Sequence, residues 1–173
     1  MLLKKRLSVC SRAIRYVAGD TVDLHISTSA ESYSIVVERI GLAREQVLAE
    51  DALPGAQHMV PEKCASEGCG WPSAHSFVIP KTWRSGFYEV TMQVEDSGGV
   101  FTHRGKRTAA SVLSFVVRSP QPGHDTKVLL QLSTNSWAAY NNYGGFSVYG
   151  CVQLQRRPAP TSILPQQPDE PVR

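Results

Sequence analysis

The sequence predicts a mainly β fold, in which an immunoglobulin-like antiparallel β-sandwich is followed by the beginning of an α/β domain. Two observations support this prediction. Residues 11–118 contain short segments of alternating apolar and polar side chains, separated by turns rich in Gly, Pro and Ser and without helical periodicity. Residues 127–132 instead form a nearly continuous apolar run, which is typical of a strand covered on both faces in a parallel sheet.

The clearest strand is expected at residues 21–27, where apolar and polar side chains alternate strictly. Val22, Leu24 and Ile26 fall on one face, which is therefore expected to face the core. His25 falls on the opposite face and is expected to be exposed to solvent. A polar turn follows and should end the strand.

Further strands are expected at residues 33–40, 77–79, 87–94 and 112–117. In the third of these, every second residue beginning with Tyr88 is apolar and is expected to face inward. Residues 42–76 contain prolines and glycines that break regular structure. We therefore expect them to form a long excursion between strands, with a short helical turn at 42–48.

The pattern divides the chain into four parts. Residues 11–118 form the predicted β-sandwich, and the prolines and glycine of residues 119–126 predict a linker. Residues 127–150 are predicted to be the start of an α/β catalytic domain, with the apolar run as its first strand and a polar loop after it. The proline-rich tail, residues 151–173, is expected to be disordered or extended.

Length, charge and cysteine content restrict the class of protein. The 173 residues carry a net charge of only +3, so we expect no nucleic-acid partner. No stretch approaches the ~20 consecutive apolar residues of a membrane span, and the basic start of the chain lacks the apolar region of a secretory signal. Four cysteines are too few for a disulfide scaffold, so we expect a cytoplasmic protein with reduced thiols.

One cysteine pair, Cys64 and Cys69, has a spacing that could supply half of a zinc site. His58 and His75 are the nearby histidines that could complete it, but their spacing matches no known zinc finger. We therefore expect free or packed thiols in a loop. The five histidines suggest no Ser-His-Asp or Cys-His arrangement for nucleophilic catalysis.

Residues 133–149 combine aromatic, amide and glycine residues to a degree that a buried core would not accept, because each phenol and amide would need a partner. One interpretation is an aromatic-rich turn anchored by Trp137 on the sandwich. The other is a site in which a tyrosine supplies a phenolate to a hard metal or a proton to an oxyanion. In that site Asn141, Asn142 and glycine amides would position a polar substrate.

The same segment carries a family resemblance. Its sequence SWAAYNNYGG at 136–145, continued by SVYG at 147–150, resembles the TW-x-AYN-x-(W/Y)GG-x-S-x-Y segment of N,N-dimethylformamidase large-subunit-like proteins. Upstream elements resemble the β-sandwich of that family in the same order, namely residues 19–24, 27–28, 37–41, 70–72, 79–80 and 83–88. The resemblance covers roughly residues 11–150.

The resemblance implies hydrolysis of the carbon–nitrogen bond of a small amide, in a domain related to glutamine-amidotransferase-like α/β folds. In that family an iron ion is held by a tyrosine and a His-x-Glu pair. The tyrosine that matches by motif is Tyr140, with Tyr143 and Tyr149 as alternatives. Asn141 and Asn142 are then the catalytic candidates, and a small subunit or a second copy of the chain is the implied partner.

The sequence departs from the family in one respect, because it contains no His-x-Glu. The family pattern is also expected to stop at Gly150. The chain is therefore expected to be a truncated family member without activity of its own. The alternative is a non-catalytic β-sandwich binding module. Residues 127–132 should distinguish the two, because they should pair within the sandwich of a binding module and lie exposed in a fragment.

Overall fold

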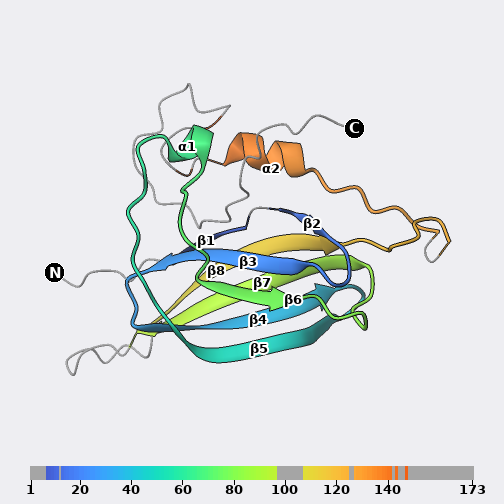
Figure 1. Ribbon diagram of the computed structural model, residues 1–173, viewed down its shortest axis with the longest axis horizontal. Coiled ribbons are helices and arrows are strands. Elements are labelled where there is room, and N and C mark those ends of the chain that lie inside the picture. Colours follow the sequence, from blue (N-terminus) through green and yellow to red (C-terminus); the bar gives the residue numbers. More distant parts are fainter. Residues whose placement is uncertain are drawn as a thin grey trace.

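Two β-sheets pack face to face in the computed structural model of the chain (Figure 1). The structure describes residues 7–11, 13–96, 107–124, 127–141, 143 and 147. One sheet has the strand order β1-β3-β6 and contains β1 (Leu7–Cys10), β3 (Thr21–Thr28) and β6 (His75–Val78). The other has the order β2-β8-β7-β4-β5 and contains β2 (Arg15–Tyr16), β4 (Ser32–Ile40), β5 (Arg44–Pro54), β7 (Gly86–Asp96) and β8 (Arg107–Val117).

Neighbouring strands of both sheets run antiparallel, apart from β2 and β8. Arg15 and Tyr16 pair in parallel with Val116 and Val117, so the beginning of the sandwich lies beside its last strand. The predicted mainly β class is thereby confirmed. The immunoglobulin-like assignment within that class stays a prediction.

The core lies between the two sheets and follows the alternation of the strands. The side chains of Val22, Leu24 and Ile26 on β3 are at most 1% exposed, as predicted. From the opposite sheet, inward-facing residues of three strands meet them: Tyr33, Ile35, Val37, Tyr88, Val90, Met92, Val94, Leu113, Phe115 and Val117. Phe115 stacks on Tyr88, with ring centroids 5.4 Å apart, so aromatic contacts join β7 to β8 at the centre.

The strand β5 replaces the helical turn predicted at 42–48. It pairs with β4 from Ser32 to Ile40 and forms the edge of its sheet. Its side chains are exposed or only partly buried, so they carry little of the alternation that marks a half-buried strand. The prediction was wrong because backbone hydrogen bonds to β4, rather than burial of apolar side chains, hold residues 44–54 in an extended conformation.

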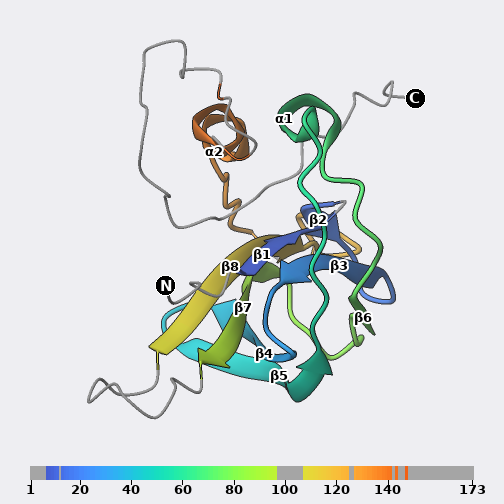
Figure 2. The ribbon, with the colours of Figure 1, turned by 90° about the vertical axis from the view of Figure 1, so that its left-hand side faces the viewer.

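The two helices lie on the same side of the sandwich (Figures 1 and 2). α1 (Cys64–Glu67) is a single turn within residues 55–74, a segment that connects β5 to β6 and that we call the cap loop. α2 (Thr134–Tyr140) follows an extended segment after β8. Within the described ranges, no helix is long and apolar enough to cross a membrane.

The strand predicted at residues 127–132 is not formed. Val128, Leu129 and Leu130 are 86%, 91% and 64% exposed, although an apolar run of this kind predicts burial. An isolated strand leaves its backbone groups to water, and no strand of either described sheet lies beside these residues to pair with them. Residues 128–130 are therefore exposed and lie outside both described sheets, and the α/β domain stays a prediction.

Gly55 joins β5 to the cap loop at a point of close backbone approach. Its N–H donates to the carbonyl oxygen of Glu31 (2.8 Å), and a Cβ at this position would overlap the carbonyl oxygen of Ala30. We expect Gly55→Ala to lower the free energy of unfolding by about 2 kcal/mol, because the backbone cannot yield as a side chain would. Urea denaturation followed by circular dichroism measures this.

Gly41→Ala, in the turn between β4 and β5, is the matched control. The nearest atom to its new methyl group would be Nη1 of Arg39 at 3.3 Å, at the end of a flexible side chain. We therefore expect a change within about 0.5 kcal/mol. Equal losses in the two variants would contradict the close approach at Gly55.

The buried phenols predict a loss of stability at alkaline pH. Burial raises the pKa of Tyr16, Tyr33 and Tyr88 above the ordinary value of 10.0. A raised pKa in the folded state means that the neutral phenols stabilise the fold fully below about pH 10, and that this contribution is lost as the pH rises further. The free energy of unfolding should be level from about pH 7 to 9 and should fall above about pH 10.

Two phenylalanine variants isolate this effect. Tyr33 Oη is buried and has no hydrogen-bond partner among the described residues, so Tyr33→Phe should be neutral or stabilising and should reduce the alkaline loss. Tyr88 Oη donates to the carbonyl oxygen of Arg84 (2.6 Å), so Tyr88→Phe should cost about 1 kcal/mol near pH 7. An unchanged alkaline profile in both variants would refute the assignment.

Candidate functional site

The cap loop is hydrogen-bonded to β3 at both of its ends. At the first end, the N–H of Thr28 donates to the carbonyl oxygen of Ala56 (2.8 Å). At the second, the N–H of Ala74 donates to the carbonyl oxygen of Leu24 (2.9 Å). These bonds hold both ends of the loop along β3. Ser27 Oγ, on the outer face of that strand, accepts a hydrogen bond from the N–H of His58 (2.9 Å), so the loop covers this face.

His25 is buried beneath the cap loop, with 7% of its surface exposed, and the prediction that it faces solvent was wrong. Alternation along a strand predicts which face a residue occupies, but it cannot show that a distant loop covers the outer face. His25 Nδ1 lies 2.7 Å from the carbonyl oxygen of Trp71. Because a carbonyl only accepts, Nδ1 carries the hydrogen and donates it.

Trp71 is the centre of a small second core. Its side chain is 6% exposed, and Nε1 donates to the carbonyl oxygen of Met59 (2.8 Å) across the cap loop. The buried residues Cys64 and Cys69 complete this core, and Cys10 and Tyr143 pack against it. The cap loop therefore folds around an indole whose polar atom is satisfied, as burial of tryptophan requires.

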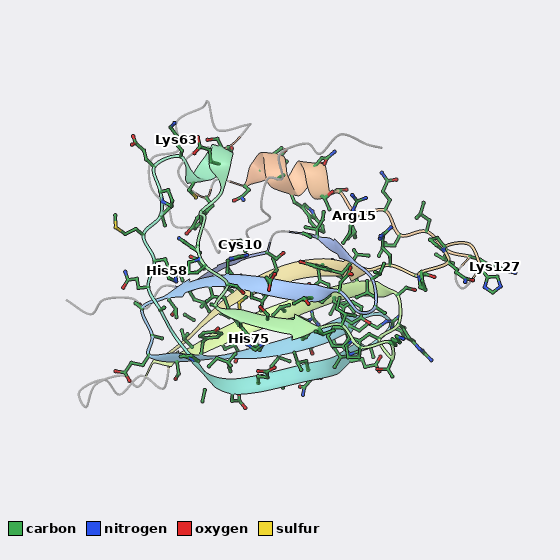
Figure 3. All side chains as sticks on the ribbon, in the orientation of Figure 1. Cys10, Arg15, His58, Lys63, His75 and Lys127 are labelled. Atoms are coloured by element: carbon green, nitrogen blue, oxygen red, sulfur yellow. The ribbon has the colours of Figure 1, made fainter. Side chains whose placement is uncertain are left out.

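Three cysteines converge here, and we call Cys10, Cys64 and Cys69 the thiol cluster. The Sγ atoms of Cys64 and Cys69 are 3.1 Å apart. Cys10 comes from β1, and Figure 3 shows it on the side of the sandwich below α1. Burial, reinforced by Cys64, raises the pKa of Cys10 to about 11, and burial followed by the hydrogen bond to Cys64 raises the pKa of Cys69. These two groups are therefore neutral thiols at physiological pH.

The zinc site considered for this loop is not assembled in the described part of the chain. His58 stacks on Trp71 with ring centroids 6.2 Å apart, and His75 Nε2 lies 3.5 Å from Glu50 Oε1. Figure 3 shows His58 on the cap loop and His75 on β6, well separated. Among the described residues, no group of three or more His, Cys, Asp or Glu side chains could hold a metal ion.

Tyr140 is the last residue of α2 and is 70% exposed. Trp137, on the same helix, is 42% exposed and belongs to neither apolar core, so it does not anchor the segment on the sandwich as one interpretation required. No residue of α2 is buried. The helix thus presents the predicted metal ligand to solvent rather than enclosing it.

The residues after α2 turn back toward the cap loop. Asn141 Oδ1 accepts a hydrogen bond from the N–H of Tyr143 (3.0 Å), which closes a local turn of the kind that asparagine favours. The Tyr143 ring then meets Trp71 edge-on, with centroids 6.3 Å apart. Burial raises the pKa of Tyr143 to about 12, with Ser8 opposing and Cys69 adding to the shift. Asn142, the second catalytic candidate, lies outside the described residues.

The structure therefore brings together only part of the predicted site. Asn141 lies next to Tyr140 in sequence, but its side-chain oxygen serves the backbone of Tyr143. Tyr143, predicted as an alternative metal ligand, packs in the second core, and Tyr149 lies outside the described residues. One exposed phenol is not a metal site, so the described residues do not fit a complete iron centre.

Sequence reasoning missed Trp71 and Cys10 as neighbours of this segment. A signal was present for Trp71, which is a large aromatic residue between a glycine and a proline in an otherwise polar loop. A residue of that size needs a place to be buried. Nothing in the sequence relates Cys10 to the other two thiols, because the contact depends on the path of the cap loop over β1 and β3.

Comparison with protein families gives one match, to the model described as N,N-dimethylformamidase beta subunit-like, C-terminal, over residues 34–170. The match begins in β4 and includes α2, and it continues past Gly150, where the resemblance was expected to stop. A comparison with curated proteins gave no match. Since the family model covers most of the sequence, the chain belongs to the N,N-dimethylformamidase beta subunit-like family.

Proposed function

We propose that this chain supplies the β-sandwich and one ligand-bearing segment of an amide-hydrolysing enzyme, and that further polypeptide supplies the rest of the active site. Membership of the N,N-dimethylformamidase beta subunit-like family supports the reaction class. The 173 residues contain no His-x-Glu pair. The resemblance implies that such a pair holds the iron ion together with the tyrosine. The small amide substrate and the iron ion are thus assigned to the assembled enzyme.

The exposed apolar run at 128–130 is the observation that carries this proposal. A self-contained binding module would have paired this segment with its sandwich, but all three side chains are more than half exposed. Trp137, only a few residues further along, adds a partly exposed indole. Contiguous exposed apolar side chains of this kind mark surfaces that another polypeptide covers. We infer that another polypeptide covers residues 128–130 and Trp137 in the assembled enzyme.

Tyr140 is the residue that this proposal assigns to the metal. A phenolate is a hard ligand that suits ferric iron, and Tyr140 stands exposed at the end of α2, where ligands from other polypeptide can approach it. Asn141 and Tyr143 tie the chain directly after Tyr140 to the cap loop. They act as positioning residues, and no step of the hydrolysis is assigned to the residues of this chain alone.

A non-catalytic binding module is the second candidate. The observation in its favour is that the two sheets enclose a core of their own, made of residues between Leu7 and Val117. The two candidates differ in whether iron and amide hydrolysis depend on Tyr140.

The first prediction from this proposal concerns iron. The chain, incubated with ferric iron and desalted, should retain no stoichiometric metal by mass spectrometry and should not hydrolyse dimethylformamide. Together with family polypeptide that carries a His-x-Glu region, it should bind iron and show the visible charge-transfer absorption of a ferric phenolate. Tyr140→Phe should abolish that absorption and lower the activity by more than about 100-fold.

Tyr143→Phe is the matched control, because it removes the phenol of an alternative ligand and keeps the ring that packs on Trp71. It should keep the ferric phenolate absorption. Stoichiometric iron with turnover in the chain alone would overturn the proposal. So would an assembled enzyme whose absorption survives in Tyr140→Phe and disappears in Tyr143→Phe.

The second prediction concerns the exposed run. Val128→Lys combined with Leu130→Lys should leave the free energy of unfolding within about 0.5 kcal/mol of its original value, because neither side chain is buried. Self-association, measured by size-exclusion chromatography with light scattering, should decrease. Leu42→Lys, at a fully exposed leucine between β4 and β5, should change neither quantity. A loss of several kcal/mol in the double variant would favour the binding module.

A further inference from the structure

The backbone around α1 brings two thiols face to face. Cys64 begins α1, and the N–H of Gly68 donates to the carbonyl oxygen of Cys64 (3.1 Å), which closes the turn. Gly68 and Gly70 have φ angles of +77° and +61°, a region that glycine occupies without strain, so the chain reverses around Cys69. The reversal returns the Cys69 thiol to the Cys64 thiol, with 3.1 Å between the sulfurs.

We propose that Cys64 and Cys69 are an oxidation site of this protein, at which hydroperoxides form a reversible disulfide within the cap loop. The two sulfurs lie about 1 Å further apart than in a disulfide bond, and both belong to one short, glycine-hinged segment that can close that gap locally. The inference does not depend on amide hydrolysis, because neither cysteine has a role in the proposed reaction.

The reaction balances with hydrogen peroxide as the oxidant. One cysteine sulfur attacks a peroxide oxygen, the O–O bond breaks, and a sulfenic acid and one water are formed. The second sulfur then attacks the sulfenic sulfur, the S–O bond breaks, and a second water leaves as the S–S bond forms. Two thiols are oxidised and one peroxide is reduced. A dithiol reductant reverses the reaction by thiol–disulfide exchange.

Burial makes this site selective for small oxidants rather than rapidly oxidised. Cys64 and Cys69 are 6% and 8% exposed, so a small peroxide reaches them more readily than a bulky disulfide such as oxidised glutathione. The raised pKa of Cys69 keeps that group as a thiol near neutral pH. The juxtaposed second sulfur captures the sulfenic acid before further oxidation, which is the arrangement of a reactive cysteine with its resolving partner.

Oxidation would alter how the segment after α2 is held. A hydrogen bond between Cys69 and Tyr143 contributes to the shifted pKa of both groups, and Tyr143 packs on Trp71, which follows Cys69 closely in the chain. The bond lowers the pKa of Cys69 and raises that of Tyr143, so the phenol hydroxyl donates and the Cys69 sulfur accepts. Closing the S–S bond draws this sulfur toward Cys64 and makes it a poorer acceptor, which weakens the contact with Tyr143. The redox state of the cap loop is thereby linked to the residues that fix the position of Tyr140.

The test uses the whole chain and hydrogen peroxide. After oxidation, denaturation, alkylation and trypsin digestion, the peptide of residues 64–81 contains both cysteines without an internal Lys or Arg. It should be found without alkyl groups and lighter by two hydrogens, and dithiothreitol should restore two alkylation sites. Cys10 and Cys151 lie in other tryptic peptides and should remain alkylated. Hydrogen–deuterium exchange of residues 134–141 should become faster on oxidation.

Cys10→Ser is the matched control, since it removes the third thiol of the cluster and should leave the Cys64–Cys69 disulfide intact. Cys64→Ser and Cys69→Ser should each abolish the disulfide-containing form of peptide 64–81. The inference is refuted if peroxide gives only sulfinic or sulfonic acids at these positions. It is equally refuted if Cys10 or Cys151 pairs with either cysteine, or if peptide 64–81 stays fully alkylated. None of these results bears on Tyr140 or iron.

Discussion

The hydrogen bond from His25 Nδ1 to the Trp71 carbonyl oxygen (2.7 Å) ties the cap loop to the outer face of the β1-β3-β6 sheet. A buried hydrogen bond of this kind contributes roughly 1 kcal/mol, but its position matters more than its strength. It fixes Trp71 near the end of the cap loop, and the thiols and Tyr143 pack with Trp71 in the second core. The positions of the candidate site residues therefore depend on the contact between His25 on β3 and the cap loop.

Much of the sandwich could be predicted from the sequence, because in β3 and β7 every second residue is apolar and each of those residues faces the core. β5 could not be predicted in this way. It is an edge strand whose side chains mostly meet solvent, so its conformation depends on hydrogen bonds to β4 and not on its own pattern. The same limit applies to His25, whose burial is imposed by a loop far along the chain.

The candidate site could be located from the sequence but not built from it. The AYNNYGG motif identified the segment, and the local turn from Asn141 to Tyr143 agrees with the chemistry of asparagine. The docking of Tyr143 on Trp71 is a long-range contact that no local pattern encodes. The run at 128–130 shows the opposite failure: apolar composition indicates a need for burial, but burial also requires a covering layer, which the described residues do not provide.

The parallel pairing of β2 with β8 has a consequence for the order in which the protein folds during synthesis. Tyr16 meets Val117, so this contact cannot form until nearly the whole sandwich has left the ribosome. The antiparallel pairs β4–β5 and β7–β8 join segments much closer in sequence and can form earlier. The segment bearing Tyr140 is made after the strand that completes the sandwich, so the sandwich can form before that segment emerges.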